Sequence, residues 1–374
     1  MERPDAHSLA DILSVAPWME FETYFDRLRE RVDAAVLASH GRREQLRQEI
    51  LAENPDLSSQ IRRPTPEKMQ WAKNLLGSGI VAASDGTVAA VPLLSGTKVQ
   101  IGVVVVTNTG ESVGLVTRVF EHELTTSGDS AREFFGNLRK VHGTSNLASQ
   151  ALMLFGERKI LLAQEADWRM IHGELIPFQL RTGVGHPREN LPAVFDLVRQ
   201  YVKDQCFIAV SESPEDLDVL NAGIVLEPGE FIELRTLADD LTGFLDGDEN
   251  AGTIKANFHK LDRATFRAFI AEVGPEVTIL LIKAGHRPFI LECHRDRAEE
   301  AAALFLADAL WTRGLPDSGA PATARGFPFH IDLADNVART MFKGGEFRAF
   351  IETRLLELGV EHGLTDLDPR RTRG

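Results

Sequence analysis

The 374-residue sequence predicts an α/β protein built on a mixed sheet, because strands come first without helices and then alternate with helices. Three consecutive β-rich segments are joined by the short turns Ser-Gly-Thr and Asn-Thr-Gly, which favour an antiparallel meander. A helix that connects two strands favours parallel pairing of those strands. The expected order is βββ-α-β-α-β, with strands at 79–94, 99–106 and 112–124, helical residues at 130–140 and 145–166, a strand at 168–178, a helix at 191–202 and a strand at 206–210.

The first strand is expected to lie in the centre of the sheet. Residues 79–90 are small and apolar on both sides of a single carboxylate, Asp85, which indicates a strand covered on both faces. Because an unpaired carboxylate is costly to bury, Asp85 is expected to be paired, hydrogen-bonded or bound to a metal. The alternative is that Asp85 and Gly86 form a type I′ hairpin turn, the commonest use of this dipeptide.

Glu157 is a second carboxylate in an apolar setting. On the helix expected at 145–166, its neighbours three and four positions away are Met153, Leu154, Ile160 and Leu161, so it projects from the apolar stripe. The alternative is that its carboxylate reaches water from the edge of the stripe. Two carboxylates in apolar settings, Asp85 and Glu157, together favour a metal site.

Composition and charge exclude several classes of protein. Apolar runs such as Ile101–Val106 are far too short to cross a bilayer, and the charged start Met1–Asp5 lacks the apolar segment of a secretory signal. Cys206 and Cys293 lie in apolar contexts and are interpreted as core thiols in a reducing compartment, so we expect a cytoplasmic protein without a membrane segment. The net charge of -14 argues against nonspecific coating of nucleic acid, and leaves room for a local basic groove or for DNA delivered by a partner.

Helical extensions flank the expected sheet. Residues 19–52 place apolar side chains three to four positions apart among charged ones, which predicts an amphipathic helix or helix pair. We interpret its stripe as packed in the core; the alternative is a surface for a partner or a second copy. Near the C-terminus, a helix at 297–313 is followed by a connector rich in Gly, Pro, Ser and Ala at 314–324, and then by a helix that carries Asp335.

Three antiparallel strands followed by alternating helices and strands is the order of elements in the ribonuclease H-like fold. In that fold a carboxylate on the first strand lies near the tip of the fourth strand. By this analogy Asp85 is expected near the end of the strand at 168–178, where the preceding helix can direct Glu157 to the same edge of the sheet.

Five pieces of the chain, spread over most of its length, carry a further signal. In this order they resemble the motifs of the NurA nucleases, a ribonuclease H-like family that works with the hexameric DNA translocase HerA. The pieces are Ile80–Thr87, similar to the family's Asp-Gly-Ser strand; Glu157, on a helix where the family has its glutamate; Trp168–Pro177, similar to the strand ending in Asp-Gly-Ser-Leu-Ile; Phe207–Ser213, similar to the strand before a Ser-Lys step; and Gly326–Asp335, similar to the C-terminal segment Gly-Tyr-Pro-Tyr-x-Leu-x-x-Ala-His.

The resemblance implies a metal-dependent DNA nuclease that acts as a homodimer with a HerA-type ATPase hexamer, in DNA end processing or in defence against phage and other foreign DNA. It implies a nuclease domain at 77–343 with insertions, an N-terminal helical region at 1–76, and a C-terminal helix and tail at 344–374. The alternative is a catalytically inactive NurA-like subunit that scaffolds or regulates the translocase.

The resemblance also implies the site. Two divalent cations, Mn²⁺ or Mg²⁺, activate water and steady the leaving oxygen of a phosphodiester. The side chains that hold them on this resemblance are Asp85, Glu157, His172 and Asp335.

Two of these positions depart from the family. His172 stands where the family has an aspartate, and Asp335 where it has a histidine. The exchange keeps one imidazole and the same number of carboxylates, so we expect an active site with exchanged ligands rather than a decayed one. Because manganese accepts nitrogen ligands more readily than magnesium, we expect a preference for Mn²⁺. A different register at the C-terminal motif gives the role of Asp335 to His330 or Asp332.

Overall fold

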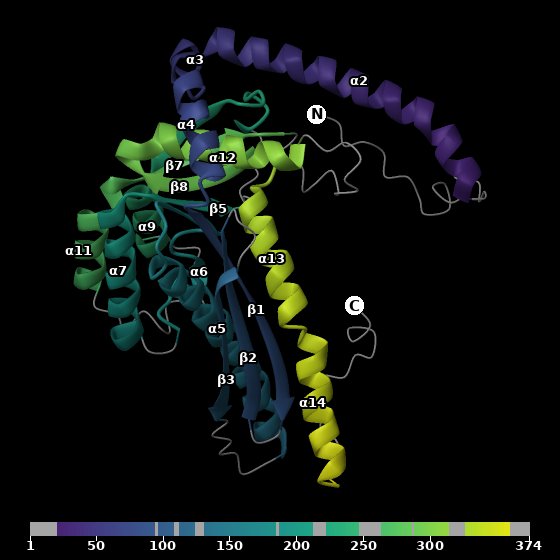
Figure 1. Cartoon of the computed structure of the whole chain (residues 1–374), viewed down its shortest axis with the longest axis vertical. Coiled ribbons are helices and arrows are strands. Elements are labelled where there is room, and N and C mark those ends of the chain that lie inside the picture. The colour runs from purple at the N-terminus through teal and green to yellow at the C-terminus, as the bar shows by residue number, and fades with distance from the viewer. Residues whose placement is uncertain are drawn as a thin grey trace. The chain divides into compact units, whose positions relative to one another are not determined.

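The computed structural model describes residues 21–93, 96–107, 112–123, 131–184, 187–211, 222–246, 263–285, 288–313 and 326–359 (Figure 1). The chain divides into two compact units, Met1–Ser58 and Ser59–Gly374, and each is described by itself. The domain boundaries expected at 76 and 343 stay predictions.

The first unit contains the long helix α2 (Phe21–Glu53). The apolar side chains expected to pack in the core are exposed in the described part of this helix: 43% for Val32, 59% for Val36 and 70% for Leu37. That interpretation was wrong for these three residues. The reason is visible in the sequence, where arginine and glutamate interrupt the apolar positions so often that no continuous face forms.

The second unit is organised by one eight-stranded sheet with the strand order β3-β2-β1-β4-β5-β8-β7-β6 (Figure 1). β1 pairs antiparallel with β2 and parallel with β4, and β4 pairs parallel with β5, as the sequence predicted. The strands are β1 (Val81–Leu93), β2 (Gly96–Thr107), β3 (Ser112–Glu123), β4 (Trp168–His172), β5 (Phe207–Ser211), β6 (Phe231–Thr236), β7 (Val277–Lys283) and β8 (Pro288–His294).

The predicted central place of the first strand is confirmed. Asp85 and Gly86 lie in the middle of β1, paired with Val104 and Val103 of β2, so the hairpin-turn alternative is excluded. Val81 and Ala83 belong to the core on one face of the sheet, and Ala82 belongs to the core on the other. The mixed α/β fold is therefore confirmed, and the ribonuclease H-like fold stays a prediction with which this strand order agrees.

Three elements differ from the sequence prediction. One helix, α5 (Ala131–Leu162), replaces the two expected, because an interior glycine such as Gly143 costs a helix only about 1 kcal/mol. β4 is shorter than expected, because Gly173 turns the chain at a positive φ of 78° directly after His172. β6 was not predicted, and the connector at 314–324 lies outside the described residues.

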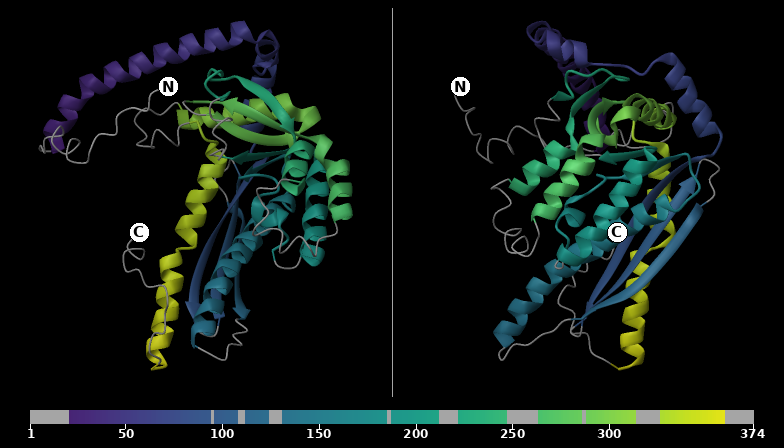
Figure 2. Two further views of the ribbon diagram at one scale, coloured as in Figure 1. Left: turned by 180° about the vertical axis from the view of Figure 1, so that it is seen from behind. Right: turned by 90° about the vertical axis from the view of Figure 1, so that its left-hand side faces the viewer.

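Helices cover both faces of the sheet, and Figure 2 shows α5 and the pair α13–α14 on opposite sides of the long strands β1 and β2. Two cores result, one between the sheet and α4, α12 and α13, the other between the sheet and α5, α7, α9 and α11. The helices are α3 (Pro55–Gln60), α4 (Pro66–Gly77), α6 (Phe178–Arg181), α7 (Pro187–Asp204), α9 (Leu237–Asp246), α11 (Arg263–Val273), α12 (Ala298–Arg313), α13 (Phe329–Met341) and α14 (Gly344–Glu357), with short 3₁₀ turns at Gly274–Glu276 and Arg295–Arg297.

α13 is fixed to the rest of the unit at both ends. At its start, the buried Asp308 of α12 accepts a hydrogen bond from the main-chain nitrogen of His330 at 3.0 Å and pairs with the His330 ring nitrogen Nδ1 at 2.6 Å. At its end, the ring of Phe342 lies directly on Gly102 of β2, in the space that a Cβ atom would need. The helix therefore has one defined position over the sheet.

We expect Gly102→Ala to lower the stability of the protein by about 1–3 kcal/mol, because its methyl group would overlap the ring of Phe342 and force the end of α13 away from β2. The measurement is the midpoint of urea unfolding. The control is Gly243→Ala on α9, where a methyl group meets nothing within 4 Å and alanine favours the helix by about 0.5–1 kcal/mol. A Gly102→Ala variant as stable as the wild type would contradict this packing.

Candidate metal centre

The candidate site lies where β4 ends beside the middle of β1. The parallel ladder runs from Val81 paired with Trp168 to Ser84 paired with Ile171, so the next residues, Asp85 and His172, stand side by side. Because side chains alternate along a strand, Asp85 faces the same side as Ala83, toward the core that contains α13. The fold therefore brings together two of the predicted ligands, as the strand order required.

Asp85 and His172 are in contact. The distance between the ring nitrogen Nδ1 of His172 and Oδ1 of Asp85 is 3.2 Å, and the main-chain nitrogen of Gly86 donates to the same oxygen at 2.8 Å. Asp85 is only 5% exposed. The imidazole of His172 also packs edge-on against the ring of Phe327, with the centroids 5.8 Å apart. The imidazole of His172 is therefore in contact with both the carboxylate of Asp85 and the ring of Phe327.

Asp335 reaches the same carboxylate from α13. It shares a side-chain hydrogen bond with Asp85, and burial, followed by the charge of Asp85, raises the pKa of Asp335. Arg339 opposes this shift, because its Nε donates to Oδ1 of Asp335 at 2.7 Å. Of the alternatives on α13, His330 pairs with Asp308 instead, and Asp332 lies in the first turn of the helix, about one turn before Asp335.

Glu157 approaches β1 from the other face of the sheet. It lies on α5, as predicted, and is 1% exposed, so it does not reach water from the edge of a stripe. Its Oε1 atom would be 2.6 Å from a Cβ atom at position 86, a space that is open only because residue 86 is glycine. Oε2 pairs with Arg158 at 3.2 Å, whereas Oε1 is buried without a hydrogen-bond partner.

The burial of Glu157 controls its ionisation. Loss of solvent raises the pKa of Glu157 to about 8, against the lowering effect of Arg158; Asp85 adds to the increase and His172 opposes it. In the absence of a cation the carboxyl group therefore keeps its proton at neutral pH. A positive charge beside Oε1 would favour the ionised form.

The residues fit a divalent cation by chemical type. Three carboxylates and one imidazole form an oxygen-rich donor set of the kind that suits Mn²⁺ or Mg²⁺, and the buried, unpaired Oε1 of Glu157 is an acceptor in need of a partner. The side chains are not gathered around one point, however: within the described ranges, no three His, Cys, Asp or Glu side chains form a ready metal-binding group. Arg158 and Arg339 each hold one of the carboxylates, so a cation must share or displace these contacts.

Sequence reasoning missed three residues that shape the site. Gly86 leaves the space for Glu157, Phe327 packs on His172, and Arg158 binds Glu157. A signal for Arg158 was available, since its neighbours on the helix include Leu154 and Leu161 and a buried arginine needs acceptors.

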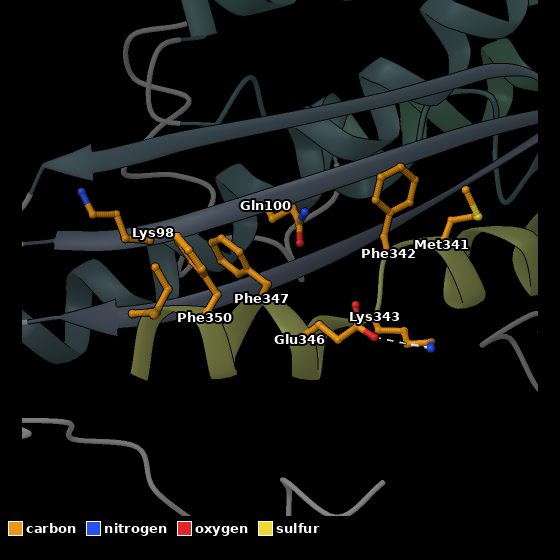
Figure 3. A pocket seen from close by; sticks show the side chains of 9 residues that line it. Lys98, Gln100, Met341, Phe342, Lys343, Glu346, Phe347 and Phe350 are labelled. Atoms are coloured by element: carbon orange, nitrogen blue, oxygen red, sulfur yellow. Dashed lines mark ion pairs between the residues drawn. The ribbon is translucent and has the colours of Figure 1, made fainter. Parts of the chain in front are cut away.

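A separate groove of about 390 Å³ lies between α14 and β2 (Figure 3). Phe342, Phe347 and Phe350 point into it from the helical side, and Lys98 and Gln100 line it from the strand. None of the four predicted ligands lines this groove.

No family model matches the chain, and no curated protein matches it in sequence. Several solved structures of NurA nucleases match most of the chain. The NurA nuclease from Sulfolobus solfataricus matches 84% of this chain and 97% of its own, with 9% identity and a TM-score of 0.44. A second NurA structure matches 92% of this chain and 99% of its own, with 12% identity and a TM-score of 0.47. A NurA structure bound to dAMP and manganese matches 88% and 98%, with 11% identity and a TM-score of 0.42.

We expect the stability of the metal-free protein to depend on pH through Glu157. The carboxyl keeps its proton up to about pH 8 in the folded state, but loses it near its ordinary value of 4.5 when unfolded. The unfolded state therefore binds fewer protons over this window, and the free energy of unfolding falls as pH rises, by at most about 1.4 kcal/mol per pH unit. Glu157→Gln should flatten the profile between pH 5 and 8, as measured by urea unfolding.

The control is Glu292→Gln, because burial also raises the pKa of Glu292 to about 8. Both variants should flatten the pH profile, but added Mn²⁺ should stabilise the wild type and Glu292→Gln more than it stabilises Glu157→Gln. Parallel pH profiles of the wild type and Glu157→Gln would contradict this account of the site.

Proposed function

We propose that this protein is a metal-dependent deoxyribonuclease whose site is formed by Asp85, Glu157, His172 and Asp335. The observation that carries the proposal is the position of Asp85, which contacts both His172 and Asp335 where β4 ends. Glu157 adds a buried oxygen atom without a partner against the adjacent residue, Gly86.

Each side chain has a role that follows from its contacts. A divalent cation bound here would lower the pKa of a water molecule and offset negative charge on the phosphodiester. Asp85 is the central carboxylate, because two of the other groups contact it directly. The ring of Phe327 limits rotation of His172, and Arg339 holds Asp335 until a cation competes for it.

The choice of DNA as substrate rests on the resemblance of five sequence pieces to NurA. We further propose that the protein works in the cytoplasm with a HerA-type hexameric ATPase, in DNA end processing or in defence against phage. The acidic composition supports this division of labour, since a motor that grips DNA supplies most of the phosphate contacts. No helix in the described ranges has the length and apolar character needed to span a membrane.

We expect linear duplex or single-stranded DNA to be cut faster with Mn²⁺ than with Mg²⁺. Asp85→Asn should reduce the rate by more than about 100-fold, since it removes a charge that no neighbour replaces. Loss of a residue that only hydrogen-bonds to a metal ligand already lowers activity by about 10–100-fold, so loss of a ligand should lower it further. The control is Asp196→Asn, which changes an exposed carboxylate on α7 paired with Arg199. His172→Asp should raise the rate with Mg²⁺ relative to Mn²⁺, because it returns an oxygen ligand.

Two outcomes would contradict parts of the proposal. A wild type that binds the motor and yet cuts no DNA with either metal, alone or with the motor, would favour the alternative, a catalytically inactive subunit that scaffolds or regulates the translocase. If DNA is cut and His172→Ala is as active as the wild type, the protein is a nuclease and the exchange of ligands plays no part.

We also propose that the protein is a homodimer and that α14 contributes the contact surface. The exposed fraction is 60% for Phe350, 72% for Leu356 and 65% for Leu358, along and just after this helix, and Phe350 also lines the groove of Figure 3. Exposed apolar side chains next to an apolar groove favour an interface between proteins.

We expect the purified protein to sediment as a dimer at micromolar concentration and Phe350→Glu to shift it to a monomer, because burying a carboxylate in an apolar contact is costly. The control is Leu37→Glu on α2, which is 70% exposed and should leave the dimer intact. A monomeric wild type would refute the dimer, and loss of the dimer in Leu37→Glu alone would place the interface on α2.

A further inference from the structure

One buried arginine lies against the site without belonging to the proposed ligand set. Arg158 follows Glu157 on α5 and is 1% exposed. Its guanidinium group binds four main-chain carbonyls and one carboxylate. The acceptors are the carbonyl oxygens of Leu154 at 2.8 Å, Leu175 at 3.0 Å, His172 at 3.4 Å and Glu174, and Oε2 of Glu157 at 3.2 Å.

Three of these carbonyls belong to the turn that ends β4. The chain turns at Gly173, and the amide groups of this turn are bonded elsewhere: Gly173 donates to the carbonyl of Val210 at 2.7 Å, and Leu175 donates to Glu292 at 2.7 Å. With its N–H groups bonded to β5 and β8, the turn presents its carbonyls to α5. Arg158 thus ties the residue that carries the imidazole ligand to the helix that carries the glutamate ligand.

Arg158 also decides which oxygen of Glu157 is available. It holds Oε2, so Oε1 is the atom that lies against Gly86 without a partner. A guanidinium fixed by four carbonyls cannot follow a rotation of the Glu157 carboxylate. The carboxylate is therefore presented with one oxygen free, on the side of β1.

We infer that Arg158 is a positioning residue that orients Glu157 as a one-oxygen ligand and sets the spacing between Glu157 and His172 across the sheet. The inference rests on the proposed function for the role of these two residues as ligands. Lysine cannot replace arginine here, because an ammonium group has three donors at one point, whereas the guanidinium has five donors spread in a plane.

The test is Mn²⁺ binding to the full chain without DNA, measured by the loss of the electron paramagnetic resonance signal of free Mn²⁺. Arg158→Lys should weaken binding by about 10- to 100-fold, as expected when a group behind a metal ligand is lost. The matched control is Arg169→Lys. Arg169 is also buried, on β4, and it bonds the carbonyls of Leu161 and Gln164 and the carboxylate of Asp204. Its replacement should change Mn²⁺ affinity less than about twofold, although both variants lose buried hydrogen bonds.

A double variant separates orientation of the ligand from general loss of stability. In a Glu157→Gln background, Arg158→Lys should weaken Mn²⁺ binding little further, because the ligand that it orients has already lost its charge. In the metal-free protein, hydrogen exchange at the amides of Gly173 and Leu175 should accelerate in Arg158→Lys and not in Arg169→Lys.

The outcomes distinguish this inference from the proposed function. Equal Mn²⁺ binding by the wild type and Arg158→Lys, an equal loss in Arg169→Lys, or additive losses with Glu157→Gln would overturn the inference and leave the nuclease proposal standing. Tight Mn²⁺ binding that depends on Arg158, without cleavage of DNA, would support the inference and overturn the nuclease. No Mn²⁺ binding by the wild type would overturn both.

Discussion

A carboxylate buried in the middle of a central strand is the constraint on which the rest of the second unit depends. Asp85 is 5% exposed, and burying a lone charge there would be unfavourable by several kcal/mol. Asp85 is in contact with an imidazole from the adjacent strand, the main-chain nitrogen of Gly86 and a second carboxyl group from α13. Asp335 brings a second carboxyl group beside Asp85, and the main-chain nitrogen of Gly86 carries no charge to balance it. The arrangement is therefore suited to a bound cation.

The main features of the sheet, and the closeness of Asp85 to other residues of the candidate site, were predictable because carboxylates are conspicuous among apolar residues. Asp85 and Glu157 stand out in the sequence for this reason, and short turns followed by alternating helices fix the order of the strands around them. Asp335 required the C-terminal motif, because on its own helix it has the appearance of an ordinary surface residue paired with Arg339.

The parts that could not be predicted depend on contacts between residues far apart in the chain. Neither the pairing of Asp308 with His330 nor the packing of Phe342 on Gly102 leaves a periodic signal in the sequence. On α2 the sequence carried a periodic signal that the structure does not match, since apolar residues recur every three to four positions but their side chains are exposed. Periodicity reports which side chains share a face and does not report what covers that face.

The position of α13 has a consequence for the order in which the protein becomes complete during synthesis. Asp85 on β1 and Asp335 on α13 are neighbours in the folded protein, yet almost the whole second unit separates them in the sequence. Contacts of this kind form late, because the ends of a long stretch of chain must meet. A chain still on the ribosome can assemble β1, α5 and β4 while the last carboxylate is missing. The candidate site therefore gains its full set of charged groups only when α13 docks.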